Sequence, residues 1–184
     1  MKDTLIIRGG NPLCGTVCAS GAKNAGLVIM AASIMADGET ILDNVPRIRD
    51  VEVMIKILND IDVDTRWNED GSLSICPLAG GIKNHTSYEL AKLLRASNLF
   101  LGAMLGRQQE ATISLPGGCD IGSRPMDLHI KGIQALGAEV NIEHGYIFAR
   151  TLNPGGSRIY LDFPSVGATE NIMMMASKTP GLSI

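Results

Sequence analysis

One pattern that occurs twice in the chain constrains its fold more than any other feature of the sequence. A helical segment leads into residues 61–65 and a hairpin around residues 68–71, and a second helical segment leads into residues 136–140 and a hairpin around residues 143–145. The two matching segments begin 75 residues apart. Copies of a strand, helix, strand, helix and hairpin unit bury their sheets and helices against one another. The sequence therefore predicts an α/β (α+β) fold assembled from such repeats.

Hydrophobic periodicity and turn residues predict the remaining elements. We expect strands at residues 5–8, 13–18 and 110–115. We expect helices at residues 23–35, 50–61 and 88–104, and after Pro125. A third copy of the repeat is expected to begin at residues 157–161, and its helix, around residues 172–176, has barely formed when the chain ends. The methionines in that helix are expected to pack in the core.

Composition and charge exclude several classes of protein. The 184 residues are 45% hydrophobic and carry a formal net charge of −3, which predicts a globular core and no basic surface for nucleic acid. No apolar run is long enough for a signal peptide or a membrane span, so we expect a cytoplasmic protein with no membrane partner. The four cysteines and three histidines show neither a disulfide framework nor a metal-ligand spacing. Cys14 and Cys18 are expected to fill an apolar strand.

A glycine-rich loop at residues 114–129 contains a thiol close to a cation. Cys119 follows a Pro-Gly-Gly turn, and Arg124 comes shortly after it, just before a predicted helix. A nearby cation lowers the pKa of a thiol and makes it a better nucleophile or acid. A single cysteine beside glycines is more often a small buried hydrophobic residue, so the loop by itself leaves both interpretations open.

Two more cations occupy positions that suit an anionic ligand. Lys23, followed by Asn24, lies in the first turn of a predicted helix, where free backbone N–H groups and a lysine together form an anion site. Arg95 has apolar neighbours on both sides. Because burying a guanidinium alone is costly, Arg95 must be paired or must reach a ligand. A solvated lysine and a structural salt bridge are the alternative interpretations.

Three motifs together resemble one family. Leu-Pro-Gly-Gly-Cys at residues 115–119, Ile-Gly-Ser-Arg-Pro-Met-Asp-Leu-His at residues 121–129 and Ser-Gly-Ala-Lys-Asn-Ala at residues 20–25 are similar to motifs of the UDP-N-acetylglucosamine enolpyruvyl transferases (1-carboxyvinyltransferases). The resemblance runs in order from about residue 5 to residue 176. It implies a fold of two similar inside-out barrel domains, each built of three βαβαββ repeats, with the substrates in the cleft between the domains.

The same resemblance implies how this chain divides. Residues 1–20 would supply strands to the second domain, and residues 21–184 would form an incomplete first domain. That domain would hold two complete repeats and a truncated third, at about residues 21–80, 81–152 and 153–184. The second catalytic domain would be absent.

The resemblance also implies a reaction and the residues that carry it. In the family the enolpyruvyl group of phosphoenolpyruvate passes to the 3-hydroxyl of UDP-N-acetylglucosamine with release of phosphate, the first committed step of peptidoglycan synthesis, without a metal or organic cofactor. By similarity, Cys119 is a proton donor that also forms a covalent adduct with phosphoenolpyruvate, and Lys23 and Arg124 are catalytic. Phosphoenolpyruvate would contact Lys23, Asn24 and Arg124. The nucleotide sugar would contact Arg95, Arg124, Pro125, Met126, Asp127, Leu128, Ser165, Val166 and Gly167.

The sequence departs from the family pattern in several places. Phe163 and Pro164 stand where some members have a lysine and an apolar residue, and Asp62 stands where relatives have glycine. The family's aspartate general base lies in the second half, so we expect the chain to need that half, or a complementing chain, for activity. A non-catalytic nucleotide-sugar-binding chain is therefore one alternative. The other is a 5-enolpyruvylshikimate-3-phosphate synthase. The N-terminal signature of that enzyme has a Lys-Ser pair, however, and the enzyme has no catalytic cysteine on this loop.

Overall fold

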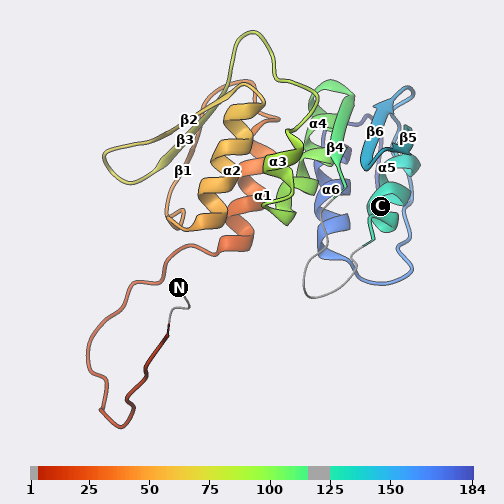
Figure 1. Cartoon of the computed structure of the whole chain (residues 1–184). Helices are drawn as coiled ribbons and strands as arrows, with labels where there is room; N and C mark the ends of the chain where they lie inside the picture. Colours follow the sequence, from red (N-terminus) through yellow and green to blue (C-terminus); the bar gives the residue numbers. More distant parts are fainter. Residues whose placement is uncertain (1–3, 116–124) are drawn as a thin grey trace.

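The structure is a computed structural model that describes residues 4–115 and 125–184 of the chain. Most of the helices lie between two three-stranded sheets at the outer sides of the molecule (Figure 1). In chain order the elements are α1 (Lys23–Ser33), β1 (Thr40–Leu42), α2 (Arg49–Asp60), β2 (Val63–Trp67), β3 (Leu73–Pro77), α3 (Tyr88–Ala91), the 3-10 helix η1 (Arg95–Leu99), α4 (Phe100–Gln108), β4 (Glu110–Ser114), α5 (Asp127–Ala135), β5 (Ala138–Glu143), β6 (Tyr146–Thr151) and α6 (Val166–Ala176). This mixture of helix and sheet confirms the predicted α/β (α+β) class.

The two sheets have the same strand order, which is the structural form of the sequence repeat. The first sheet is ordered β1-β3-β2 and the second β4-β6-β5, and neighbouring strands run antiparallel. In each sheet the strand between the two helices of the unit pairs with the last strand of its hairpin, so that Thr40 lies opposite Ile75 and Glu110 lies opposite Arg150. The strand, helix and hairpin of both expected repeats are therefore present, whereas the leading strand of a βαβαββ unit is not formed in the described residues.

The junction between helix and hairpin needs a left-handed residue in both repeats. Asp62, which follows α2, has a φ of 64°, and Gly137, which follows α5, has a φ of 96°. Glycine adopts this region without strain, whereas an aspartate does so at some cost because of its Cβ. Lys83 Nζ lies 3.3 Å from Asp62 Oδ1 and gives the aspartate an ionic partner. The unusual aspartate is therefore tolerated at a position that suits glycine.

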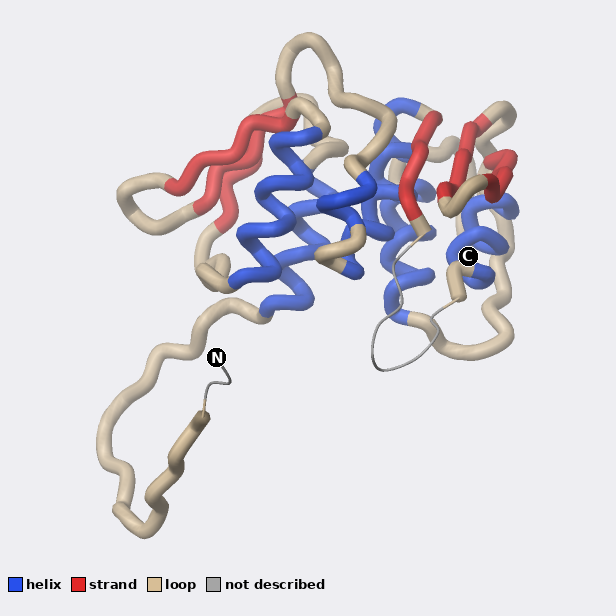
Figure 2. Tube along the Cα trace, viewed as in Figure 1, coloured by secondary structure: helices blue, strands red, loops and turns tan. Residues whose placement is uncertain are grey.

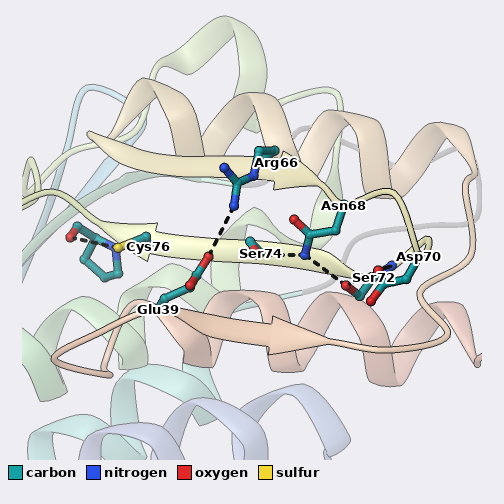
Figure 3. A network of polar contacts seen from close by, with 8 residues as sticks. Glu39, Arg66, Asn68, Asp70, Ser72, Ser74 and Cys76 are labelled. Carbon is teal, nitrogen blue, oxygen red and sulfur yellow. Dashed lines mark hydrogen bonds and ion pairs between the residues drawn. The ribbon is translucent and has the colours of Figure 1, made fainter.

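Side-chain hydrogen bonds close the hairpin between β2 and β3 (Figure 3). Asn68 donates from Nδ2 to the hydroxyls of Ser72 and Ser74, both at 2.9 Å. The Ser72 hydroxyl donates to Asp70 Oδ1 at 2.7 Å, and the Ser72 backbone N–H donates to the same oxygen at 2.9 Å. These two bonds lower the pKa of the Asp70 carboxyl from its ordinary value. They fix the turn that the sequence predicted at residues 68–71.

Two glycines allow α6 to pack closely against its neighbours. A Cβ on Gly102, in α4, would lie 2.2 Å from the backbone oxygen of Asn171, and a Cβ on Gly132, in α5, would lie 2.1 Å from Cδ1 of Ile172. Two of the three methionines at residues 173–175 are buried in this junction, as expected of core residues. Among the residues that the structure describes, no helix combines the length and the apolar character needed to cross a bilayer.

The structure differs from the sequence-based prediction at its N-terminal end. Residues 4–22 contain neither helix nor strand, and they extend away from the folded body (Figure 2). The strands expected at residues 5–8 and 13–18 are therefore not formed here, because a strand needs a partner to bond its backbone groups. Cys14 and Cys18 are exposed, so the expectation that they fill an apolar strand is wrong in this structure. The assignment of this segment to a second domain stays a prediction.

Two other predicted elements have different limits. The helix expected at residues 88–104 is divided into α3, η1 and α4. In the third copy, residues 157–161 form no strand, although the Ile159 N–H donates to the Ile184 carbonyl at 2.7 Å and the Ile184 N–H donates to the Ser157 carbonyl at 3.0 Å. The helix of this copy begins at Val166, several residues earlier than predicted.

Candidate active site

Residues from three segments that are remote in sequence line one pocket. The first turns of α1, η1 and α6 surround a cavity of ≈ 620 Å³. Six of the residues singled out in the sequence line it, namely Lys23, Asn24, Arg95, Ser165, Val166 and Gly167. Asp50, His129 and Glu170 contribute further polar groups to the lining.

A close contact of Gly21 sets the start of α1 and with it the place of Lys23. The Gly21 N–H donates to Asn44 Oδ1 at 3.1 Å, and a Cβ on Gly21 would lie 2.0 Å from the Asn44 carbonyl oxygen. Lys23 and Asn24 then occupy the first turn of α1, as predicted. The Lys23 ammonium lies 2.7 Å from Oδ2 of Asp50, and the two side chains are 48% and 36% exposed. The carboxylate therefore holds the ammonium at the pocket wall while leaving it accessible.

A break in the helical segment brings Arg95 to the same pocket. Leu94 is extended, with φ −135° and ψ 114°, and η1 starts at Arg95. The Ser97 hydroxyl donates to the Ala91 carbonyl at 3.0 Å and so satisfies a carbonyl at the end of α3. Arg95 is exposed, so the expectation of a guanidinium held among apolar side chains is wrong. Its place at the pocket follows from the break in the helix instead.

The first turn of α6 closes the third side of the pocket. Ser165 caps the helix, because its Oγ accepts from the Ala168 N–H at 3.4 Å. A Cβ on Gly167 would lie 3.2 Å from Cε1 of His129, so the absence of a side chain lets the imidazole approach the start of α6. The N-termini of α1 and α6 and the cations Lys23 and Arg95 together make the pocket suitable for an anion.

The segment that follows the glycine-rich loop contributes less to the pocket than expected. The side chains of Met126 and Leu128 are buried, whereas Pro125 and Asp127 are exposed. Asn98 Nδ2 donates to the Met126 sulfur at 3.6 Å and ties it to the interior. None of these four residues lines the pocket. The buried side chains of Met126 and Leu128 therefore present little surface to a ligand.

Cys119 and Arg124 lie outside the described residues. The expected grouping of the thiol with Lys23, Arg95 and Arg124 therefore stays a prediction.

Sequence reasoning missed a buried polar pair beside the pocket. Asn171, in α6, is fully buried, and its Nδ2 lies 2.9 Å from Nδ1 of His129, in α5. Burial lowers the pKa of the His129 imidazole and favours its neutral form. Burial also raises the pKa of the Glu170 carboxyl. A single polar residue inside a helical segment has no spacing signal, so only the tertiary contact reveals this pair.

Known proteins are similar to this chain over nearly all of its length. The family described as EPSP synthase (3-phosphoshikimate 1-carboxyvinyltransferase) matches residues 7–184. UDP-N-acetylglucosamine 1-carboxyvinyltransferase 1 of Caldanaerobacter subterraneus subsp. tengcongensis is 46% identical, and the match covers 100% of this chain and 44% of that protein. UDP-N-acetylglucosamine 1-carboxyvinyltransferase 2 of Clostridium tetani is 44% identical, with 99% of this chain and 44% of that protein covered.

Two solved structures share the fold at low sequence identity. The enolpyruvyl transferase NikO from Streptomyces tendae matches with a TM-score of 0.73 at 18% identity, over 91% of this chain and 39% of that one. EPSP synthase from Acinetobacter baumannii matches with a TM-score of 0.67 at 17% identity, over 88% of this chain and 37% of that one. These likenesses confirm the enolpyruvyl transferase-like fold expected from the sequence. The chain spans less than half the length of these relatives, and the family match over residues 7–184 makes it a member of the EPSP synthase family.

Proposed function

We propose that the chain is part of an enzyme that transfers the 1-carboxyvinyl (enolpyruvyl) group of phosphoenolpyruvate to the 3-hydroxyl of UDP-N-acetylglucosamine and releases phosphate. The observation that carries this proposal is the pocket in which Lys23, Arg95 and the first turn of α6 meet. Both substrates carry phosphate groups, and cations next to free helix amides bind such groups well. The reaction would begin peptidoglycan synthesis, and the cytoplasmic location expected from the sequence stays a prediction.

Each side of the pocket has a proposed partner on the substrates. Lys23, Asn24 and Arg124 would hold the phosphate and carboxylate of phosphoenolpyruvate. The nucleotide sugar would be held by Arg95, Arg124, Pro125, Met126, Asp127, Leu128, Ser165, Val166 and Gly167. Because the Met126 and Leu128 side chains are buried, their part in binding falls to the backbone.

The proposed chemistry uses the thiol and the cations in different steps. Cys119 protonates C3 of phosphoenolpyruvate, and C2 becomes an electrophile. The 3-hydroxyl oxygen bonds to C2 and loses its proton to a base. We expect this base to lie in the part of the relatives that this chain does not span. A base then takes a proton from C3, the C2–C3 double bond re-forms as the bond between C2 and the phosphate oxygen breaks, and phosphate leaves. Lys23 and Arg124 stabilise the charge that moves onto the phosphate, and the scheme needs no metal or organic cofactor.

One other function has specific observations in its favour. Transfer to shikimate 3-phosphate is favoured by the family description and by the Acinetobacter baumannii structure. Against it, the relatives named for UDP-N-acetylglucosamine are 44% and 46% identical to the chain, whereas the EPSP synthase structure is 17% identical. A non-catalytic nucleotide-sugar-binding chain stays the second alternative that the sequence left open.

A chimera separates these three functions. This chain replaces the matching part of the Caldanaerobacter subterraneus protein, and phosphate release is measured with phosphoenolpyruvate and either UDP-N-acetylglucosamine or shikimate 3-phosphate. We expect release only with the nucleotide sugar, and little release from the isolated chain with the same substrates. A Cys119→Ser chimera is the matched inactive control. Release only with shikimate 3-phosphate, or no release from a folded chimera beside an active parent, would contradict the proposal.

A further inference from the structure

Both the oxygen and the nitrogen of the Asn171 amide are hydrogen-bonded where α6 packs against α4, η1 and α5. Its Oδ1 accepts from the Gly102 backbone N–H, in α4, at 2.6 Å. Its Nδ2 donates to the Asn98 carbonyl, in η1, at 3.2 Å, and it lies 2.9 Å from Nδ1 of His129, in α5. Asn171 is 0% exposed, so water does not substitute for these partners.

The two backbone partners fix the orientation of the Asn171 amide. A backbone N–H only donates, and a backbone carbonyl only accepts. Rotating the amide by half a turn would place its NH₂ against the Gly102 N–H and its oxygen against the Asn98 carbonyl. Both contacts would be repulsive, so the group that faces His129 is the NH₂ donor.

A donor at this place determines which nitrogen of His129 carries the proton. Nδ1 must accept from Asn171, and a neutral imidazole that accepts at Nδ1 has its proton on Nε2. Burial lowers the pKa of the ring and favours its neutral form. The tautomer therefore follows from the contacts that Asn171 makes with Gly102 and Asn98.

The other edge of the His129 ring faces the pocket. His129 lines the cavity together with Lys23, Arg95 and the first turn of α6, although its side chain is only 5% exposed. A Cβ on Gly167 would lie 3.5 Å from Nε2, so the missing side chain keeps this nitrogen close to the start of α6. Within residues 4–115 and 125–184, Nε2 has no hydrogen-bond partner.

We propose that Asn171 is a positioning residue that holds His129 as the Nε2–H tautomer, so that the imidazole offers a neutral donor to an anionic oxygen of the ligand in this pocket. The identity of the ligand rests on the proposed function, whereas the tautomer does not. Lys23 and Arg95 supply the positive charge in the pocket. The imidazole adds a directed hydrogen bond without a further charge.

Long-range ¹H–¹⁵N NMR spectra of the ligand-free chain test the positioning step directly. Above the ordinary histidine pKa of about 6.5, we expect His129 to show one protonated nitrogen at Nε2. The exposed His144 serves as an internal reference. A His129→Gln variant assigns the signals. A proton on Nδ1 of His129 in the unmodified chain would overturn the proposal. This measurement is made on the unmodified chain and does not depend on the folding of a variant.

An Asn171→Asp variant tests the cause of the tautomer. A carboxylate still accepts from Gly102, but it also accepts from His129 and draws a proton to Nδ1. We expect the Nδ1 signal to change from unprotonated to protonated. Asn153→Asp is the matched control, because it makes the same change at an exposed site. We expect it to leave Nδ1 of His129 unprotonated. An unchanged Nε2–H tautomer in a folded Asn171→Asp variant would overturn the role of Asn171.

Titration with UDP-N-acetylglucosamine tests the donor step. We expect the Nε2 proton resonance to shift on binding, and we expect His129→Phe to weaken binding roughly 10- to 100-fold, as for one lost hydrogen bond to a charged group. Binding without that shift and with equal affinity in His129→Phe would overturn the donor role. Absence of binding to the unmodified chain would instead contradict the proposed function, and an Nε2–H tautomer in that sample would still support the positioning role.

Discussion

The ammonium of Lys23 lies 2.7 Å from Oδ2 of Asp50, and this contact joins the first turn of α1 to the first turn of α2 at the wall of the pocket. Both side chains are more than a third exposed, at 48% and 36%, so solvent screens the pair. Its contribution to the free energy of unfolding is therefore small, about 0–1 kcal/mol. The value of the pair lies in holding a cation beside the free amides of a helix N-terminus.

A Lys23→Ala substitution is expected to reduce ligand binding far more than stability. Loss of one charged hydrogen bond to a phosphate lowers affinity roughly 10- to 100-fold. Calorimetric titration with UDP-N-acetylglucosamine or phosphoenolpyruvate measures this change, and urea denaturation measures the stability. Lys131→Ala is the matched control, because Lys131 pairs with Asp162 at 2.8 Å with similar exposure and does not line the pocket. Equal affinities for the two variants would contradict the placement of Lys23 at the site.

Two Gly→Ala substitutions are expected to change stability in opposite directions. In α4, a Cβ on Gly102 would lie 2.2 Å from the backbone oxygen of Asn171, so Gly102→Ala forces α4 and α6 apart and costs about 1–3 kcal/mol or more. In α1, a Cβ on Gly26 meets no atom within 4 Å. Gly26→Ala therefore stabilises the helix by roughly 0.5–1 kcal/mol. Urea denaturation curves compare the two, and a stable Gly102→Ala variant would argue against this close approach of α6.

The buried His129 is expected to make stability depend on pH below neutrality. Burial lowers its pKa from the ordinary value of 6.5. Between the lowered pKa and 6.5, the unfolded chain binds a proton that the folded chain does not. The free energy of unfolding therefore rises with pH in this window. The contribution of His129 to it is lost as the solution is acidified from pH 6.5 towards the pKa of His129 in the folded chain. Above 6.5 the residue contributes no slope.

Urea denaturation at a series of pH values, with and without a His129→Gln substitution, checks this prediction. The difference between the two proteins should change below pH 6.5 and stay constant above it. Glu170→Gln is a useful second control, because burial raises the pKa of Glu170 from 4.5 and makes stability fall as pH rises above that value, the opposite sign. Identical pH profiles for the unmodified chain and His129→Gln would show that the imidazole has no perturbed titration.

Thiol labelling is expected to separate the exposed cysteines from the proposed reactive one. Cys14 and Cys18 are exposed, so a neutral reagent such as iodoacetamide should label them readily. Fosfomycin, an epoxide that carries a phosphonate, should instead label Cys119 first if the thiol lies beside Lys23 and Arg95. Peptide mapping by mass spectrometry identifies the labelled residues. Lys23→Ala should slow the labelling of Cys119 by fosfomycin and leave the labelling of Cys14 unchanged, and equal fosfomycin labelling of all four cysteines would count against the assembled site.

Local sequence signals were sufficient for the repeated elements. The apolar spacing of residues 51–58 predicted α2, and Asn-Glu-Asp-Gly at residues 68–71 predicted the hairpin that Asn68 and Ser72 close. These signals are local because a helix face and a turn are set by residues a few positions apart. The same reasoning gave strands at residues 5–8 and 13–18 that the structure lacks, since a strand depends on a partner that local spacing does not specify.

The sequence by itself determined which residue types are available: a lysine in the first turn of a helix, a thiol on a glycine-rich loop, and the repeat that builds the sheets. Only the tertiary structure decided that Lys23, Arg95 and residues 165–167 share one pocket, because packing of α1, η1 and α6 brings together segments that are remote in the chain. It also decided the role of Asn171. An asparagine inside a helix has the same local sequence signal whether it is solvated or buried, and here its buried contacts with Gly102, Asn98 and His129 give it a single orientation.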